Sequence, residues 1–164
     1  MIRASLLTIL LAGFALAPHE AQATRKFDAC FEQAGAHFGI SPLLLRAIAR
    51  QESSFNPRAQ NLSNRNGSED RGLMQINSFW FPKLERVGID PEGLWDPCVS
   101  ITVGAWILAG EIRRYGLTWH AIGRYNARSP QYIRRYAARI QRNLAIELRE
   151  AQRLREQALA AGHP

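Results

Sequence analysis

The chain has 164 residues, of which 46% are hydrophobic, and its formal net charge is +7. A chain of this length forms one domain with an adequate core, and it contains no internal repeat and no Gly-, Ser- or Pro-rich linker that would divide it. The positive charge favours anionic partners. The two cysteines and four histidines lack the spacing of metal ligands, so we expect no metal and no cofactor.

The first 23 residues have the pattern of a signal peptide. One early positive charge precedes an uncharged run that is too short to span a bilayer, and the run leads to the small-x-small tripeptide Ala21-Gln22-Ala23. We therefore expect cleavage near Ala23, with an uncleaved membrane anchor as the alternative. In both cases the domain leaves the cytoplasm, and after cleavage it is periplasmic or secreted and not an integral membrane protein. A nucleic-acid partner is then not expected.

Cys30 and Cys98 are the only two cysteines. A single pair in an exported chain is usually a disulfide, and the alternative is two buried free thiols. Closing a loop of nearly seventy residues stabilises a fold by about 4 kcal/mol on the chain-entropy model. We expect the disulfide.

The first half of the chain is predicted to form two helices and a loop. Apolar residues recur at helical spacing and almost nowhere alternate, which predicts a mostly α fold. An apolar stripe over 27–38 ends at Gly39. Ser41 and Pro42 are typical of an N-cap and a first helical residue, and this second helix ends near Ser53. Residues 58–70 are polar and predict an exposed loop.

The second half predicts a short helix around residues 79–82, a buried central helix opened by Asp96-Pro97, a short helix over 119–125 and a long helix opened by Pro130. Beyond Ile146 the apolar stripe thins while charge rises. We therefore expect a domain over 24–146 and a charged helical or frayed tail over 147–164. The many arginines of the C-terminal third are either a solvated helix face or a surface that binds the cell wall or a partner.

Glu52 is the most informative position. It follows Leu45 by seven residues and Ile48 by four, so its carboxyl lies on the helix stripe that faces the core. Burial without a partner and a place in the last helical turn both raise the pKa of a carboxyl group. A carboxylic acid that stays protonated near neutral pH can act as a general acid. The alternative is an ion pair with Arg46 or Arg50.

Three segments of the chain resemble, in order, the motifs of the lytic transglycosylases with a lysozyme-like SLT domain. These segments are Glu52-Ser53-Ser54-Phe55-Asn56-Pro57, Gly72-Leu73-Met74-Gln75-Ile76 and Tyr125-Asn126-Ala127. The resemblance covers roughly residues 28–143. The compact size, the Asp96-Pro97-Cys98 segment and the leader make the chain most similar to the small members that accompany secretion systems and pili.

The resemblance implies a lysozyme-like fold and cleavage of the MurNAc-GlcNAc β-1,4 bond of peptidoglycan, with formation of 1,6-anhydro-MurNAc. Glu52 aligns with the family's sole catalytic acid/base, whereas ordinary glycosidases use two carboxylates. The implied partners are peptidoglycan glycan strands and components of a secretion system or pilus. The resemblance assigns substrate binding to Ser53, Ser54, Met74, Gln75, Tyr125 and Asn126.

Two other functions stay open at this point, and so does the choice between cutting within strands and at their ends. A lysozyme-type hydrolase on the same fold needs a second carboxylate, for which Asp70 is the candidate. A non-catalytic wall-binding or assembly module needs none. The chain also departs from the family, because Arg128 follows Ala127 where the family usually has a glycine, which puts the geometry of that turn in question.

Overall fold

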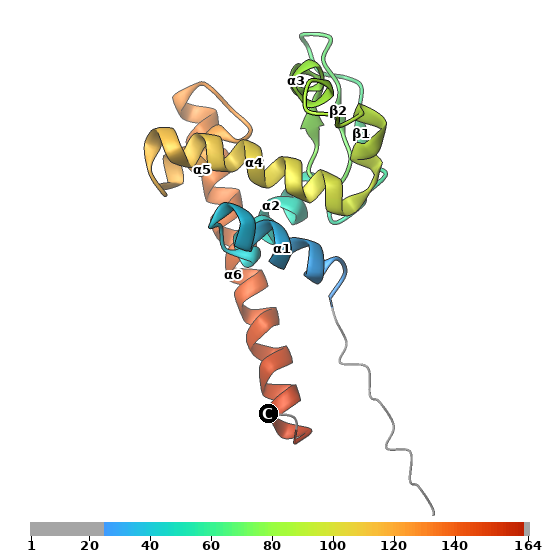
Figure 1. Cartoon of the computed structure of the whole chain (residues 1–164). Helices are drawn as coiled ribbons and strands as arrows, with labels where there is room; N and C mark the ends of the chain where they lie inside the picture. Colours follow the sequence, from blue (N-terminus) through green and yellow to red (C-terminus); the bar gives the residue numbers. More distant parts are fainter. Residues whose placement is uncertain (1–24, 163–164) are drawn as a thin grey trace, which may run out of the picture.

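The computed structural model describes residues 25–162, so the expected signal peptide and its cleavage site lie outside the described residues. Within this range the predicted mostly α class is confirmed (Figure 1). The helices are α1 (Asp28–Phe38), α2 (Pro42–Ser53), α3 (Phe81–Glu85), α4 (Pro97–Tyr115), α5 (Trp119–Arg124) and α6 (Pro130–Ala160), with short 3-10 helices η1 (Ser78–Trp80) and η2 (Pro91–Trp95).

The helix boundaries follow from local signals in the sequence. The chain leaves α1 through Gly39, which adopts a left-handed conformation with φ 67°. Pro42 opens α2 after Ser41, although the Ser41 hydroxyl makes no capping hydrogen bond. The Asp96 carboxylate accepts a hydrogen bond from the Val99 amide at 2.9 Å and so caps α4.

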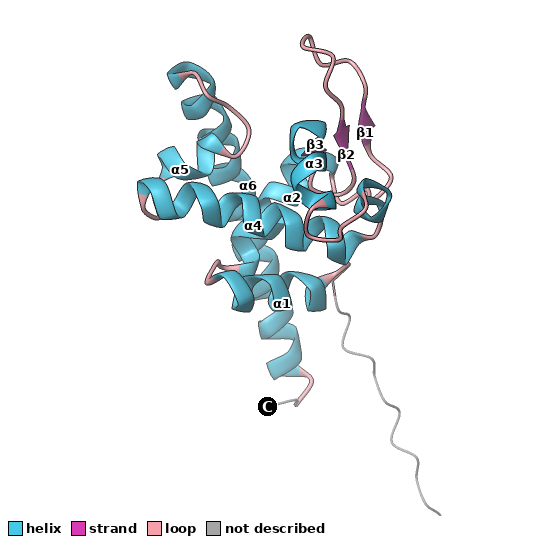
Figure 2. Cartoon of the chain, turned by 45° about the horizontal axis from the view of Figure 1, so that its top comes forward, coloured by secondary structure: helices cyan, strands magenta, loops and turns pink. Residues whose placement is uncertain are grey.

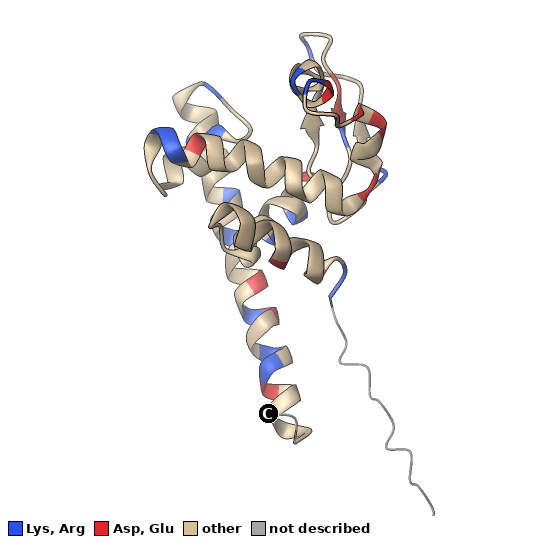
Figure 3. Cartoon of the chain, in the orientation of Figure 1, with Lys and Arg blue, Asp and Glu red and all other residues tan. Residues whose placement is uncertain are grey.

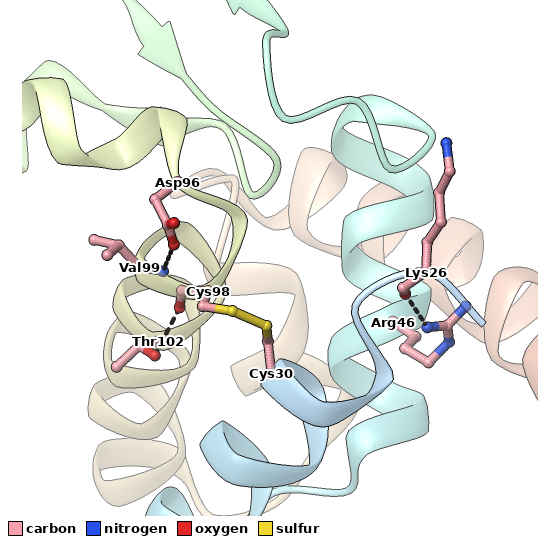
Figure 4. Close-up of a disulfide and its surroundings, with 7 residues drawn as sticks. All are labelled: Lys26, Cys30, Arg46, Asp96, Cys98, Val99 and Thr102. Carbon is pink, nitrogen blue, oxygen red and sulfur yellow. Dashed lines mark hydrogen bonds between the residues drawn. A yellow bond between two sulfur atoms is a disulfide. The ribbon is translucent and has the colours of Figure 1, made fainter. Parts of the chain in front are cut away.

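The expected disulfide joins Cys30 on α1 to Cys98 on α4 (Figure 4). The two Cα atoms lie 5.0 Å apart and 68 residues apart in sequence. Because α4 is the buried central helix of the fold, this bridge ties the first helix directly to the core.

The core forms where α1 packs with α2 and α4, and where α6 packs with α2 and α5. The close approach of the second motif to α4 depends on Gly104, since a Cβ atom at that position would lie 2.7 Å from the terminal methyl group of Met74. Met74 is fully buried there. The core therefore fixes the segment that contains the second motif against the central helix.

A small antiparallel sheet breaks the helical pattern. Its strands are β1 (Gln60–Asn61), β2 (Asp70–Arg71) and β3 (Ile76–Asn77), with Gln60 opposite Arg71 and Asp70 opposite Asn77. Figure 2 shows these strands together beside α3. The sequence predicted only a loop over 58–70, because strands of two residues are too short to display alternation.

α6 is one continuous helix from Pro130 to Ala160, and it crosses the expected domain boundary at residue 146 without a break. In Figure 1 its C-terminal half runs beyond the other helices. Glu147, the first residue of the expected tail, is fully buried. None of the helices between residues 25 and 162 has the length and apolar character that a membrane crossing requires.

Candidate active site

A polar groove of about 830 Å³ lies between the sheet and the helical part of the molecule. Its walls come from the end of α2, the loop that joins β1 to β2, the segment from Gln75 to Trp80, and the segment from Tyr125 to Arg128. The lining residues are Glu52, Asn61, Asn64, Arg65, Asn66, Ser68, Asp70, Gln75, Ile76, Asn77, Phe79, Trp80, Ile107, Tyr125, Asn126 and Arg128.

Glu52 lines this groove from the last turn of α2. Burial raises the pKa of its carboxyl group to about 7, and the negative charge of Asp70 acts in the same direction. A hydrogen bond from Tyr136 and the charge of Arg139 oppose this rise in pKa without cancelling it. At neutral pH a large fraction of Glu52 therefore carries a proton.

Glu52 does not form the ion pair that was the alternative in the sequence. Arg46 and Arg50 both donate to Glu147 instead, at 2.8 and 2.7 Å. Residues two positions apart on a helix point about 200° apart, so the Arg50 side chain leaves α2 on the side away from Glu52. The carboxyl of Glu52 thus faces the groove without an arginine bound to it.

Two tyrosines hold the glutamate and the motifs in place. Tyr136 on α6 is 1% exposed, and its hydroxyl donates a short hydrogen bond to Oε1 of Glu52. The ring of Tyr125 stacks on the Tyr136 ring at 6.4 Å, and its hydroxyl donates to the Met74 carbonyl at 2.9 Å. Burial and the nearby Glu52 charge raise the pKa of both tyrosines well above 10. Both phenols are therefore neutral hydrogen-bond donors.

Asp70 is a second carboxylate that lines the groove. Three asparagine amides donate to it: Asn61 at 3.1 Å, Asn64 at 2.9 Å and Asn77 at 2.7 Å. Hydrogen bonds donated to the ionised form stabilise a carboxylate. The sheet thus presents a fixed negative charge to the groove and to Glu52.

The structure brings only some of the expected substrate-binding residues to the groove. Gln75, Tyr125 and Asn126 line it, whereas Ser53, Ser54 and Met74 do not. The Ser53 hydroxyl donates to the Leu73 carbonyl at 2.7 Å rather than to the Glu52 carboxyl. Ser54 is exposed beside the groove, as the left-handed C-cap of α2.

These contacts join the three motifs to one another. Ser53 of the first motif binds the backbone of the second, and so does Tyr125 of the third. The Gln75 amide donates to the carbonyls of Ala59 and Gly72, both at 2.9 Å. The side chains of Ser53, Gln75 and Tyr125 thus link the segments around the groove by hydrogen bonds to backbone carbonyl groups.

Backbone conformations that side chains disfavour gather beside Glu52. Ser54 and Phe55 have φ values of 52° and 63°, and Gln75 has 48°. Each costs about 1–2 kcal/mol and persists only where the surrounding structure enforces it. Gly72 has φ 77°, and a Cβ atom there would lie 2.2 Å from the Leu94 carbonyl oxygen, so only glycine fits this position.

Arg128, which replaces the family glycine, has no positive φ in the structure. The turn therefore does not need a glycine in this chain. Its guanidinium lies 3.3 Å from Oε1 of Glu111, and its side chain also reaches the Arg124 carbonyl. Arg128 is 57% exposed in its side chain and lines one end of the groove.

Aromatic rings form one wall of the groove. Phe79 and Trp80 line it and meet edge to face at 5.3 Å, and Trp106 packs behind Trp80 at 5.3 Å. The ammonium group of Lys83 lies 4.6 Å from the Phe79 ring centre and 4.4 Å from that of Trp80. Of the four tryptophans, Trp80 lines the groove, whereas Trp95, Trp106 and Trp119 do not.

Sequence reasoning missed two parts of the site. Tyr136 falls on the apolar stripe of α6, so its periodicity indicates only core packing. Asn61 and Asn64 belong to the segment predicted as an exposed loop, whereas Asn77 follows it. The pairing of β1 and β3 with β2 brings Asn61 and Asn77 to Asp70. Between residues 25 and 162, no group of three or more His, Cys, Asp or Glu side chains is placed to hold a metal ion.

The mostly helical fold with its polar groove is that of the lysozyme-like class of glycan-cleaving enzymes. The family model of the transglycosylase SLT domain matches residues 29–144. The chain belongs to this family, and it is a peptidoglycan lytic transglycosylase. Both the resemblance of its motifs and the expected fold are thereby confirmed.

The chain is also similar to individual proteins. It is 47% identical over 119 residues to "Invasion protein IagB" of Salmonella typhi, which covers 70% of this chain and 74% of that protein. It is 43% identical over 99 residues to "Protein IpgF" of Shigella flexneri, covering 60% and 64%. Its fold matches a solved structure of an inactive mutant of the lytic transglycosylase Slt from Pseudomonas aeruginosa, with TM-score 0.61 and 20% identity, over 76% of this chain and 24% of that one.

Proposed function

We propose that Glu52 is the single catalytic acid/base of this transglycosylase and that the products are 1,6-anhydro-MurNAc ends. The observation that carries the proposal is a groove-lining carboxyl whose pKa is raised to about 7. A general acid is most effective when its pKa lies near the working pH. Burial of Glu52 and the negative charge of Asp70 raise its pKa into that range.

In the first step the proton of Glu52 passes to the oxygen of the scissile bond between C1 of MurNAc and O4 of GlcNAc. That bond breaks and GlcNAc leaves with a free 4-hydroxyl group. In the second step the Glu52 carboxylate takes the proton of the MurNAc C6 hydroxyl, whose oxygen bonds to C1. The glutamate ends in its starting protonation state, and no water is consumed.

The neighbours of Glu52 support both steps. The Tyr136 hydroxyl donates to one carboxylate oxygen, so it orients the group and stabilises the anion that forms after proton transfer. Gln75, Tyr125 and Asn126 line the groove and bind the sugars in this proposal. We assign Ser53 and Met74 to holding the second motif in place, because the Ser53 hydroxyl donates to the Leu73 carbonyl and Met74 packs against α4. Ser54 ends α2 in a left-handed conformation.

A lysozyme-type hydrolase is the second candidate, and Asp70 is the observation that favours it. This carboxylate lines the groove with Glu52, as a residue that positions water or stabilises a cationic sugar would have to. Membership of the transglycosylase family favours the anhydro product. In that case Asp70 acts by its charge, which keeps the proton on Glu52.

We further propose that the enzyme acts outside the cytoplasm and opens the wall locally for an assembling secretion system or pilus. The similarity to a protein named for invasion supports this role. The leader over 1–23 supports export.

The test is mass spectrometry of purified peptidoglycan digested by the wild type and by Glu52→Gln. We expect anhydro-MurNAc ends from the wild type and no products from the variant, whose amide cannot donate an acidic proton. Glu32→Gln is the matched control, because Glu32 is an exposed glutamate on α1. Reducing ends in the wild-type digest would instead identify a hydrolase, and turnover by Glu52→Gln would refute the assignment of that residue.

A further inference from the structure

The segment of α6 that follows the family domain contains a buried charge. The family model ends at residue 144, yet the side chain of Glu147 is fully buried on the same helix. Three arginines surround it, with Arg25 at 3.4 Å, Arg46 at 2.8 Å and Arg50 at 2.7 Å. An ionised side chain is rarely buried unless it is paired in this way.

The arginines extend the cluster to α1 and to the start of the described chain. Arg46 is 3% exposed and also donates to the Asp28 carboxylate at 2.9 Å. It donates to the Lys26 carbonyl at 2.9 Å as well (Figure 4). Arg50 donates to Glu150, one turn further along α6, at 2.8 Å. Figure 3 shows acidic and basic residues together along this stretch of α6.

The same two arginines also contact Phe55 in the first motif. The guanidinium of Arg46 lies 4.8 Å from the ring centre of Phe55, and that of Arg50 lies 5.3 Å from it. Phe31 packs against Phe55 edge to face at 6.2 Å. Phe55 follows Glu52 by three residues, and its strained φ of 63° needs such contacts to persist.

α2 and α6 also contact each other at two further positions along their length. Tyr136 donates to Glu52 at one end, and Asn143 donates to the Ala47 carbonyl at 3.3 Å nearer the middle. Tyr136 and Glu147 lie about three helical turns apart on α6, so they face the same side. Glu52 pairs with Tyr136 and Ala47 with Asn143, so α2 and α6 run antiparallel. Together with the ion pairs of Glu147, these contacts fix the position of one helix along the other.

From this geometry we infer that Glu147 is a positioning residue for Glu52. It orients Arg46 and Arg50 so that they clamp Phe55, and it fixes α2 along α6 so that Glu52 lies opposite Tyr136. The inference rests on the proposed role of Glu52 and extends it: Glu147, a buried residue of the expected tail, positions the catalytic acid. A misplacement of about 1 Å at a reacting group can cost on the order of 100-fold in rate.

The test compares Glu147→Gln with Glu150→Gln in the full chain. Both variants lose one negative charge that faces Arg50, but the Glu150 side chain is 28% exposed. We expect Glu147→Gln to lower kcat on solubilised glycan strands about tenfold or more, at a temperature where it is fully folded, with KM changed less than about twofold. Glu150→Gln stays within about twofold of the wild type in both constants.

Leu84→Ala controls for lost stability, because Leu84 is a buried residue of α3 and lies outside the α2–α6 interface. This variant lowers the melting temperature while kcat of the folded protein is retained. A folded Glu147→Gln protein with the kcat of the wild type would overturn the inference. In that event an inactive Glu52→Gln would leave the proposed function standing, whereas an active Glu52→Gln would refute the proposed function itself.

Phe55→Leu gives a second route that leaves the buried charges intact, in case Glu147→Gln does not fold. Leucine keeps an apolar side chain but removes the ring face on which both arginines lie. We expect the same loss of kcat. The double variant with Glu147→Gln and Phe55→Leu should be no slower than the slower single variant, because the effects of residues that act through one another do not add. An unchanged kcat in Phe55→Leu, or independent multiplying losses in the double variant, would contradict the clamp.

Discussion

Replacing Tyr136 with phenylalanine removes the hydroxyl that donates to Glu52 and keeps the ring that stacks on Tyr125. A hydrogen bond to a charged group contributes about 1.5–3 kcal/mol, and one pKa unit corresponds to about 1.4 kcal/mol. Because this bond lowers the pKa of Glu52, its loss raises that pKa by about 1–2 units. The pKa of Glu52 then lies above the value of about 7 that it has in the wild type.

The sign of the effect on activity follows from the role of the proton. An enzyme that needs protonated Glu52 is active below the pKa of this group and loses activity as pH rises through it. The alkaline limb of kcat/KM against pH therefore shifts upward by about 1–2 units in Tyr136→Phe. Tyr132→Phe is the control, since Tyr132 is 53% exposed on the same helix. A limb that stays in place or moves to lower pH would refute this account of the site.

Three other changes test the electrostatics and the covalent frame. Asp70→Asn removes a charge that raises the pKa of Glu52, so the alkaline limb of kcat/KM against pH moves to lower pH. The wall products stay the same by mass spectrometry. Wild-type products with reducing ends that are lost in Asp70→Asn would instead show hydrolysis. Glu52→Gln removes a carboxyl whose pKa rises from 4.5 to about 7 on folding. That rise lowers wild-type stability by up to about 3 kcal/mol above pH 7 and by nothing below pH 4. The melting temperatures of the wild type and Glu52→Gln should therefore diverge as pH rises between these limits. Melting temperatures that differ by a constant amount across this pH range would exclude the rise in the pKa of Glu52. Joint replacement of Cys30 and Cys98 by serine removes the bridge between α1 and α4 and costs about 4 kcal/mol in chemical denaturation, whereas an unchanged midpoint would mean that the bridge adds no stability.

The helices could be predicted from the sequence because each has a local signal. Pro42, Asp96-Pro97 and Pro130 mark helix starts, and the apolar stripes between them have the period of a helix. The direction of the pKa shift of Glu52 also followed from its place on such a stripe. These features depend on residues within one or two helical turns of each other.

The rest of the site depends on contacts between distant segments, which periodicity does not encode. Tyr136 lies 84 residues from Glu52, and its spacing on α6 is that of any core residue. Asn61 and Asn77 face Asp70 only because β2 pairs with β1 and β3 in one register. Glu147 was assigned to a charged tail for the same reason, since its three arginine partners are supplied by α2 and by the chain before α1.

The features that make Glu52 an acid also destabilise the end of α2. Burial opposes ionisation of Glu52. Ser54 and Phe55, which follow closely, have left-handed backbone conformations. The cluster around Glu147 faces the opposite side of that helix end and acts on it through Phe55. Buried ion pairs often contribute little net stability, so the value of this cluster lies in the geometry that it enforces. A helix end that holds a strained turn and a protonated carboxyl needs such contacts on its far side, and α6 supplies them beyond the limit of the family domain.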